Sequence, residues 1–305
     1  MSDKQQAWLA DPGNRIVSPA SDDYPVLLRR IPSPPAQLYI VGNIGALHLP
    51  ALSIVGSRNP TRGGKRNAYE FAKHLARCGF CIVSGLAQGI DTAAHQGALD
   101  ADAVTVALLG HGIDRVYPAA NHGLAHEISR NGALVSEYPL GSPPRREHFP
   151  QRNRLISGLS LGTLVVEAAS RSGSLITARL AGEQGREVFA IPGSIHNPLS
   201  RGCHQLIRQG AKLVESADDI VSELAPLAGH LMQSESAEDD ASCPGADTDV
   251  EYAALMNALS FDPASADELA ENSGLTIDQV SSMLLILELE EKVEAVSGGK
   301  YSKRK

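Results

Sequence analysis

The sequence predicts an α/β fold with a mostly parallel sheet covered by helices on both faces, followed by a small C-terminal winged-helix domain. Two observations lead to this prediction. From Leu52 onward, apolar runs of strand length alternate with helical patterns, as expected when helices connect parallel strands. After an acidic stretch near the C-terminus, three short helical patterns are followed by a glycine-tipped hairpin pattern.

The first part of the chain, residues 1–50, is rich in proline. We expect it to form an extended segment that wraps around the core rather than a domain of its own, because proline is poorly suited to the interior of helices and sheets. The prolines are Pro12, Pro19, Pro25, Pro32, Pro34, Pro35 and Pro50.

Six apolar runs predict the strands of the central sheet, and each is followed by Gly, Ser or Pro. Nearly uncharged runs suit strands that are buried on both faces. Their polar C-terminal ends share one edge of the sheet, where open α/β sheets bind ligands. The expected strands are Leu52–Val55, Cys81–Ser84, Val104–Leu109, Ala133–Ser136, Thr163–Val166 and Glu187–Ile191.

Residues 227–249 are rich in Gly, Ser, Ala, Glu and Asp, which predicts an acidic flexible linker. Residues 250–305 then follow the winged-helix pattern. A first helix is expected over Tyr252–Leu259, Ser265 and Glu268 form a capping box for a second, and Thr276 caps a third. Residues 292–301 can form a short wing. The apolar residues at helical spacing in the third helix are Ile277, Val280, Met283, Leu284 and Leu287.

Charge is divided unevenly along the chain. Residues 1–226 carry 22 basic and 19 acidic side chains, a balance of +3, whereas residues 227–305 carry 5 and 16, a balance of −11. The two parts must therefore meet different partners. The N-terminus lacks the apolar run of a signal peptide, and no stretch approaches the roughly 18 apolar residues of a membrane span. We expect a cytoplasmic protein without a membrane span.

Cys78 and Cys81 form a Cys-x-x-Cys pair, a spacing found in redox and zinc sites. Packing explains both residues, because Cys78 ends a helical pattern, Gly79 fits the left-handed position after it, and Cys81 opens an apolar strand. No second pair supplies the remaining ligands of a structural zinc. We therefore predict no metal site.

Three turns that combine glycine with hydroxyl or arginine side chains follow predicted strands. Glycine lets backbone amides approach an anion, while hydroxyl and guanidinium groups can bind its oxygens. Each turn alone could be an ordinary strand-to-helix connection, but their convergence on one edge favours a binding site. The residues are Gly56, Ser57 and Arg58, then Ser84 and Gly85, then Ser172, Gly173, Ser174 and Thr177.

Residues 145–154 place four arginines around Phe149. Arginine can contact phosphates while an aromatic ring offers a stacking face, so this composition suits a single strand with exposed bases. A solvated basic loop is the alternative, for which Phe149 would be a poor choice. The arginines are Arg145, Arg146, Arg152 and Arg154.

Together these motifs resemble the DNA processing protein A family, also called the Smf family, from about Asp22 to Leu224. The segment after the linker resembles the winged helix at the C-terminus of many members. The motifs are, in order, Ile54-Val-Gly-Ser-Arg58, Ser84-Gly-Leu-Ala-x-Gly-Ile-Asp91 with His95, Tyr117-Pro118, Ser136-Glu-Tyr138, Phe149-Pro-x-Arg-Asn-Arg154, Val165-Val-Glu167, Ser172-Gly-Ser-Leu-Ile-Thr177 and Ile191-Pro-Gly193.

The resemblance implies that residues 51–226 form an extended Rossmann-like domain that dimerises, binds single-stranded DNA and passes it to the RecA recombinase in natural transformation. It implies no reaction and no cofactor. Two positions depart from the family, because Gln88 and Ala119 stand where basic residues are common, which should reduce phosphate contacts. The residues implied to face the DNA are Gly56, Ser57, Arg58, Arg146, Phe149, Arg152, Asn153 and Arg154.

Two other functions were weighed. A nucleotide-processing enzyme resembling the phosphoribohydrolases would need a glutamate three residues after Thr177, where this chain has Leu180. Asp91 and His95 could form a catalytic pair, but we expect Asp91 to cap its helix and His95 to pack beneath it. A winged helix that reads duplex DNA would need basic residues in residues 276–291, which contain none. We predict a protein that is not an enzyme.

Overall fold

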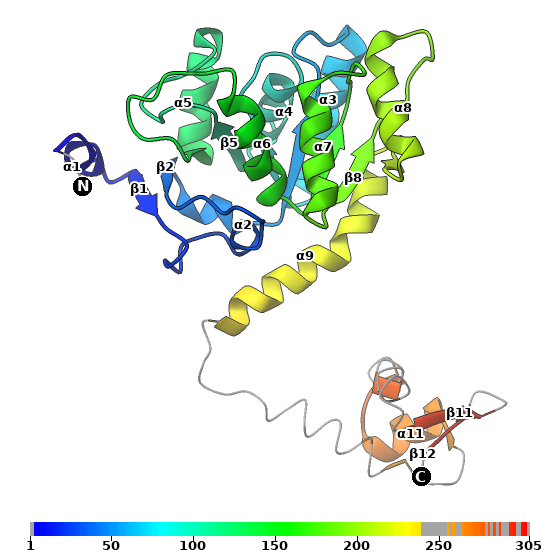
Figure 1. Cartoon of the computed structure of the whole chain (residues 1–305). Coiled ribbons are helices and arrows are strands. Elements are labelled where there is room, and N and C mark those ends of the chain that lie inside the picture. The colour runs from blue at the N-terminus through cyan, green and yellow to red at the C-terminus, as the bar shows by residue number, and fades with distance from the viewer. Residues whose placement is uncertain are drawn as a thin grey trace. The chain divides into compact units, whose positions relative to one another are not determined.

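A computed structural model of the chain describes residues 3–238 and, nearer the C-terminus, residues 255, 258–259, 264–277, 280, 283–284, 287, 293–296 and 300–303 (Figure 1). The chain divides into two compact units, Met1–Glu235 and Ser236–Lys305. None of the helices within the described residues is long and apolar enough to cross a membrane.

The first unit is built on a nine-stranded sheet with the order β1-β2-β6-β5-β4-β3-β7-β8-β9. Strands β3 to β9 pair in parallel, and all six predicted strands are present among them. The prediction of a mostly parallel α/β sheet is therefore confirmed. The strands are β1 (Asn14–Val17), β2 (Leu38–Gly42), β3 (Ala51–Val55), β4 (Cys81–Ser84), β5 (Thr105–Leu109), β6 (Ala133–Ser136), β7 (Gly162–Val165), β8 (Glu187–Ala190) and β9 (Lys212–Leu213).

Helices cover both faces of this sheet (Figure 1). On one face, Ala72 and Leu75 of α3 pack with Leu52 of β3 in a shared apolar cluster. On the other face, Leu155 of α6 and Leu206 of α8 belong to a second cluster. The main helices of the unit are α3 (Arg62–Arg77), α4 (Ile90–Leu99), α5 (His122–Asn131), α6 (His148–Gly158), α7 (Gly173–Glu183) and α8 (Arg201–Arg208).

The N-terminal segment differs from the extended wrapping segment expected for residues 1–50. Strand β2 pairs antiparallel with β6, and β1 pairs antiparallel with β2, so this segment extends the sheet. The residues before and between these strands form the short helices α1 (Asp3–Leu9) and α2 (Val26–Arg29). Proline did not prevent pairing, because the prolines lie outside both strands.

The strand order places a switch point at β3. Strands β4, β5 and β6 follow one another on one side of β3, whereas β7, β8 and β9 follow on the other. The connections after β3 and β7 therefore leave the sheet in opposite directions and open a crevice beyond their carboxyl ends. This crevice is the expected place for a ligand.

The two cysteines of the Cys-x-x-Cys pair occupy different environments. Cys78 is exposed at the C-cap of α3, Gly79 follows with a φ of +91°, and Cys81 is buried in β4. Burial raises the pKa of the Cys81 thiol to about 12, so this thiol stays protonated at neutral pH. The geometry agrees with the packing interpretation for Cys81, but not for Cys78, which is exposed.

The predicted linker begins differently from the expectation, since helix α9 (Asp218–Glu238) continues through Pro226 into residues 227–238. Residues 239–249 lie outside the described residues. In the second unit, Ser265 and Glu268 form the predicted capping box at the start of α11 (Ala266–Ser273), and Gly274 ends this helix in the left-handed conformation. The wing strands are β11 (Val293–Val296) and β12 (Lys300–Lys303), and β12 also pairs with β10 (Ala264–Ser265).

The apolar pattern of the predicted third helix accounts for four of the nine buried residues of this small core. Val280, Met283, Leu284 and Leu287 are buried together with Leu255 and Leu269. Ile277 is the exception, because 54% of its surface is exposed. Ile277 stands next to the predicted cap Thr276, before the buried face of the repeat begins.

Candidate nucleic-acid interface

The turn after β3 is held tightly against the start of α4. The amide of Ile90 donates to the carbonyl of Ser57 at 3.1 Å, and a Cβ at Gly56 would lie 2.7 Å from the Ile90 side chain. Gly89 has a φ of +87°, and its Cβ position is occupied by the carbonyl oxygens of Ser57 and Arg58. Only glycine fits at these close approaches, so the two turns form one rigid edge.

Arg58 projects from this edge toward an aromatic pair. Its guanidinium carbon lies 5.6 Å from the ring centre of Phe149 at the start of α6, within the range of a cation–π contact. The ring of Tyr117 lies 5.8 Å from that of Phe149, at an interplanar angle of 38°. Half of the Tyr117 surface is exposed. A guanidinium and two mutually tilted rings thus cluster at one place and offer faces on which a base can stack.

A cavity of about 700 Å³ opens beside these groups at the switch point. It brings together turns from β3, β4 and β7 with the N-terminal half of α6, as the sequence predicted. Arg146 lines the cavity as an exposed side chain. The predicted residues that line it are Gly56, Arg58, Arg146, Phe149, Arg152, Asn153, Ser172, Gly173, Ser174 and Thr177.

The start of α7 forms another wall of the cavity. Ser172 is the N-cap and accepts a hydrogen bond from the amide of Ser174, and the two hydroxyls are 2.7 Å apart. The Asn153 side chain of α6 donates to the carbonyl of Gly173 at 3.3 Å and ties the two helices together. Because a helix N-terminus carries partial positive charge, this wall favours an anion.

Arg152 lies beneath the cavity and is only 4% exposed. Its guanidinium donates to the backbone carbonyls of Gly85, at 2.9 Å, and Leu108. Burial lowers its pKa to about 10, against the opposing effect of nearby Asp91. Arg152 therefore supports the cavity floor through protein carbonyls, a role that the arginine-rich sequence did not reveal.

Asp91 acts on the same floor. Its carboxylate accepts hydrogen bonds from the amides of Gly85 and Ala87, both at 3.2 Å, whereas the N-cap of α4 is Gly89. Burial raises the pKa of Asp91, and Arg152 opposes that effect. The expected helix cap is thus wrong in detail, because Asp91 holds the preceding turn instead.

His95 packs beneath this turn, as expected. It is fully buried, and its Nδ1 lies 2.7 Å from the hydroxyl of Thr105. Burial, reinforced by Arg152, lowers its pKa to about 3. No hydrogen bond between Asp91 and His95 occurs in residues 3–238, so the two do not form a catalytic pair there.

Four predicted residues lie outside the main cavity. The Ser57 hydroxyl accepts from the amide of Asn59 within its own turn, and the buried Ser84 hydroxyl donates to the carbonyl of Ile54. Gly85 lines a neighbouring hollow of about 140 Å³, which it shares with Arg58, Gln88 and Tyr117. Arg154 forms an ion pair with Glu137, and the carboxylate is largely buried.

Tyr117 is the residue of this site that sequence reasoning missed. In the sequence, the Tyr117-Pro118 pair was interpreted only as one of the family motifs. The available signal was its position before a proline, in the loop between the predicted third and fourth strands. Its proximity to Phe149 depends on the fold. Tyr117 lines both the main cavity and the smaller hollow.

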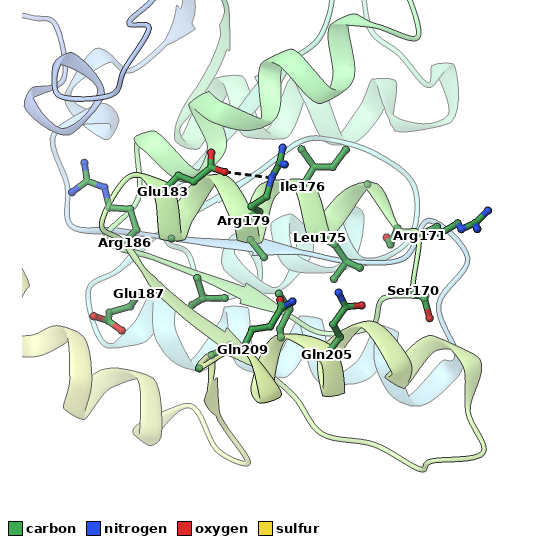
Figure 2. Close-up of a pocket in the computed structure, with 18 residues that line it drawn as sticks. Ser170, Arg171, Leu175, Ile176, Arg179, Glu183, Arg186, Glu187, Gln205 and Gln209 are labelled. Carbon is green, nitrogen blue, oxygen red and sulfur yellow. Dashed lines mark ion pairs between the residues drawn. The ribbon is translucent and has the colours of Figure 1, made fainter.

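A larger hollow of about 850 Å³ lies on the other side of α7, between α7 and α8 (Figure 2). Only Ser172 and Gly173 line both this hollow and the switch-point cavity. Arg179 and Glu183 form an ion pair of 3.6 Å within it, and Glu187 adds a second carboxylate. Arg171 and Arg186 also line the hollow, so its charges are mixed. The switch-point cavity has Asp91 as its one acidic lining residue, and Arg58 and Arg146 form no ion pair within the described residues. The switch-point cavity is therefore better suited to a polyanion. The described residues contain no cluster of histidine, cysteine or carboxylate side chains that could hold a metal ion.

The fold and site define a class: a Rossmann-like α/β protein whose switch-point crevice combines unpaired arginines, a helix N-terminus and aromatic rings. Residues 15–225 match the family described as DNA recombination-mediator protein A, and residues 239–299 match the DprA winged helix domain. The chain belongs to the DNA recombination-mediator protein A family, also called DprA or Smf.

Known relatives are similar over most of the chain. Protein Smf of Escherichia coli is 42% identical over 293 residues, which are 96% of this chain and 78% of that protein. The crystal structure of DprA from Streptococcus pneumoniae superposes with a TM-score of 0.68 at 43% identity, covering 73% of this chain and 78% of that one.

A second solved structure is that of DNA processing protein A from Helicobacter pylori, whose description refers to its single-stranded DNA binding mode. It superposes with a TM-score of 0.64 at 31% identity and covers 70% of this chain and 96% of the other.

Proposed function

We propose that this protein binds single-stranded DNA in the switch-point cavity. The observation that carries the proposal is the cluster of Arg58, Phe149 and Tyr117 next to Arg146. Unpaired bases expose faces that stack on such rings, while arginines and the α7 N-terminus neutralise phosphates. A duplex would not offer those faces. The relative from Helicobacter pylori, which is described as binding single-stranded DNA, supports the same ligand class.

We further propose that binding proceeds without catalysis. The carboxylates near the crevice already have partners: Asp91 accepts two amides, Glu137 pairs with Arg154, and Glu167 accepts from the amide and hydroxyl of Thr61. A general base needs a carboxylate that can reach the reacting proton. Leu180 stands in α7 at the position where the phosphoribohydrolase pattern requires glutamate.

In the cell, this binding would serve as recombination mediation. The bound strand would be protected and transferred to the RecA recombinase, with a homodimer as the working form. Membership in the DNA recombination-mediator protein A family supports this role. A direct measurement is RecA filament assembly on single-stranded DNA coated with a single-strand-binding protein, which should speed up when this protein is added and stay unchanged if the proposed transfer is wrong.

The binding proposal is tested by titrating fluorescent oligothymidylate with the full chain at several salt concentrations. Binding that weakens with salt, without conversion of the oligomer, is the expected result. Absence of binding even at low salt would refute it. Turnover of a nucleoside monophosphate would instead support the enzyme alternative.

A further inference from the structure

A second cationic hollow lies next to the switch-point cavity, between the first turns of α3 and α4. It encloses about 370 Å³. Helix α3 contributes Arg62, Lys65 and Arg66, and all three are exposed. The remaining lining residues are Tyr69, Thr92, Ala93 and Gln96, so no acidic side chain lines the hollow.

The three cations have no acidic partner within the part of the chain that the structure describes. By contrast, Arg179 pairs with Glu183, and Lys212 pairs with Glu223, so other surface cations of the unit are partly neutralised. The one acid within α3, Glu70, lines a different hollow on that helix. Asp100 accepts hydrogen bonds from two lining side chains, Tyr69 and Gln96, but forms no ion pair with the three cations within the described residues. Three positive charges against one negative charge leave a local positive potential in a chain whose net charge is −8.

The hollow and the switch-point cavity lie close together, because residues that are near in the sequence line both of them. Arg58 lines the cavity and Arg62 lines the hollow, so their Cα atoms are at most about 14 Å apart. On the opposite wall, Asp91 faces the cavity and the next residue, Thr92, faces the hollow. If its nucleotides are spaced as in one strand of duplex DNA, about 3.4 Å apart, roughly four nucleotides of the bound strand span that distance.

The backbone between the two sites is fixed. Glu167, which follows β7, accepts from the amide and the hydroxyl of Thr61, and Thr61 caps α3. The Thr92 hydroxyl donates to the carbonyl of Ala87 in the cavity wall at 2.8 Å. The cations of α3 are therefore presented at a set position relative to the cavity, as a phosphate track requires.

We propose that the Arg62, Lys65 and Arg66 hollow binds the phosphates of the single strand where it leaves the switch-point cavity. This inference rests on the proposed function and extends it, because it assigns the strand a path over the α3–α4 face. The hollow contributes charge rather than stacking, since the Lys73 ammonium already lies over the Tyr69 ring, 5.5 Å from its centre. Affinity should therefore grow with strand length beyond what the cavity alone can hold.

The test compares the full-length triple variant Arg62→Gln, Lys65→Gln and Arg66→Gln with the wild-type chain. Fluorescent oligothymidylates of about 3 nucleotides, too short to span both sites, and of about 20 nucleotides are titrated over a range of salt concentrations. The control is the triple variant Arg77→Gln, Arg130→Gln and Arg208→Gln, which removes the same charge from exposed positions elsewhere. Thermal melting checks that both variants are folded.

For the long oligomer, we expect the α3 variant to lose about tenfold in affinity and its salt slope to flatten by about 2. The short oligomer should bind as it does to the wild type, and the control should be nearly unaffected. Equal losses in both triple variants, or no loss with the long oligomer, would overturn the proposal. Tighter binding by the α3 variant would also overturn it and would identify an acidic protein segment as the occupant. If the wild type bound neither oligomer, the proposed function itself would fail.

Discussion

The guanidinium carbon of Arg58 lies 5.6 Å from the ring centre of Phe149, although one residue follows β3 and the other begins α6. The fold thus brings a cationic and an aromatic group from two distant turns into one cluster. Stacking of a base on such a cluster contributes about 1–3 kcal/mol.

Replacement of the ring, Phe149→Ala, should weaken binding of oligothymidylate by about 5- to 150-fold, since one stacking contact of that size is lost. Phe149→Tyr keeps an aromatic face and should bind within a few fold of the wild type. Fluorescence anisotropy measures both. Equal affinity of the alanine variant and the wild type would remove Phe149 from the interface.

Tyr117 should contribute through its ring rather than its hydroxyl. Tyr117→Ala is expected to lose at least about fivefold in affinity, whereas Tyr117→Phe should bind like the wild type. The side chain is half exposed, so neither change should lower the melting temperature much. A phenylalanine variant as weak as the alanine variant would point to a hydrogen bond instead of stacking.

Arg146 should act on phosphates without regard to base sequence. Arg146→Ala should flatten the slope of log affinity against log salt by about 0.7 for a single strand. Its neighbour Arg145 is also exposed but does not line the cavity, so Arg145→Ala is a matched control. Titrations with oligothymidylate and oligoadenylate should show the same loss for Arg146→Ala. A base-dependent loss would indicate contact with bases.

His95 makes folding stability depend on pH in a defined direction. Its folded pKa is lowered to about 3 by burial and by Arg152, whereas an unfolded histidine has a pKa near 6.5. Between these values the unfolded state binds more protons, so stability rises with pH and falls on acidification. Between pH 7 and pH 5 the loss should be about 2 kcal/mol from this group.

Urea denaturation of the wild type and of His95→Gln at both pH values tests this expectation. The variant is less stable at pH 7 if the Thr105 contact is weakened, but its stability should change less between the two pH values. The same pH dependence in both proteins would show that the pKa of His95 does not differ between the folded and unfolded states.

The acidic C-terminal part should not be needed for strand binding. A chain ending at Glu238 keeps α9 complete and removes the C-terminal residues beyond it. Because the removed residues 239–305 carry 5 basic and 14 acidic side chains, a balance of −9, we expect the shortened chain to bind oligothymidylate as tightly as the full chain or more tightly. An affinity drop of tenfold or more would show that the winged helix contributes contacts.

Much of the fold could be predicted because buried parallel strands have a strong sequence signature. The runs at 52–55 and 81–84 became β3 and β4, and the Ser265–Glu268 capping box was present as expected. Strands β1 and β2 were missed because each is short and lies among prolines, and pairing with β6 decided their conformation. Helix α9 passed through Pro226 for a similar reason, since Ile220 and Leu224 anchor its first turns in the core.

The candidate site shows where sequence reasoning reaches its limit. The position of Arg58 at the cavity followed from a turn at the end of a strand, and those of Arg146 and Phe149 from the arginine-rich motif and the family resemblance. The different environments of Arg152 and Arg154 did not follow, because two arginines in one helix differ only in which face they occupy. Arg152 points to buried carbonyls, and Arg154 points to Glu137.

The borders of the main sheet have a consequence for self-association. Strand β1 has four residues and β9 has two, so each border offers few free amides and carbonyls to another chain. Growth of the sheet by strand addition would yield little hydrogen bonding, which disfavours edge-to-edge aggregation. Contacts between copies of this chain are therefore expected to use side-chain surfaces of helices and loops instead of a shared sheet.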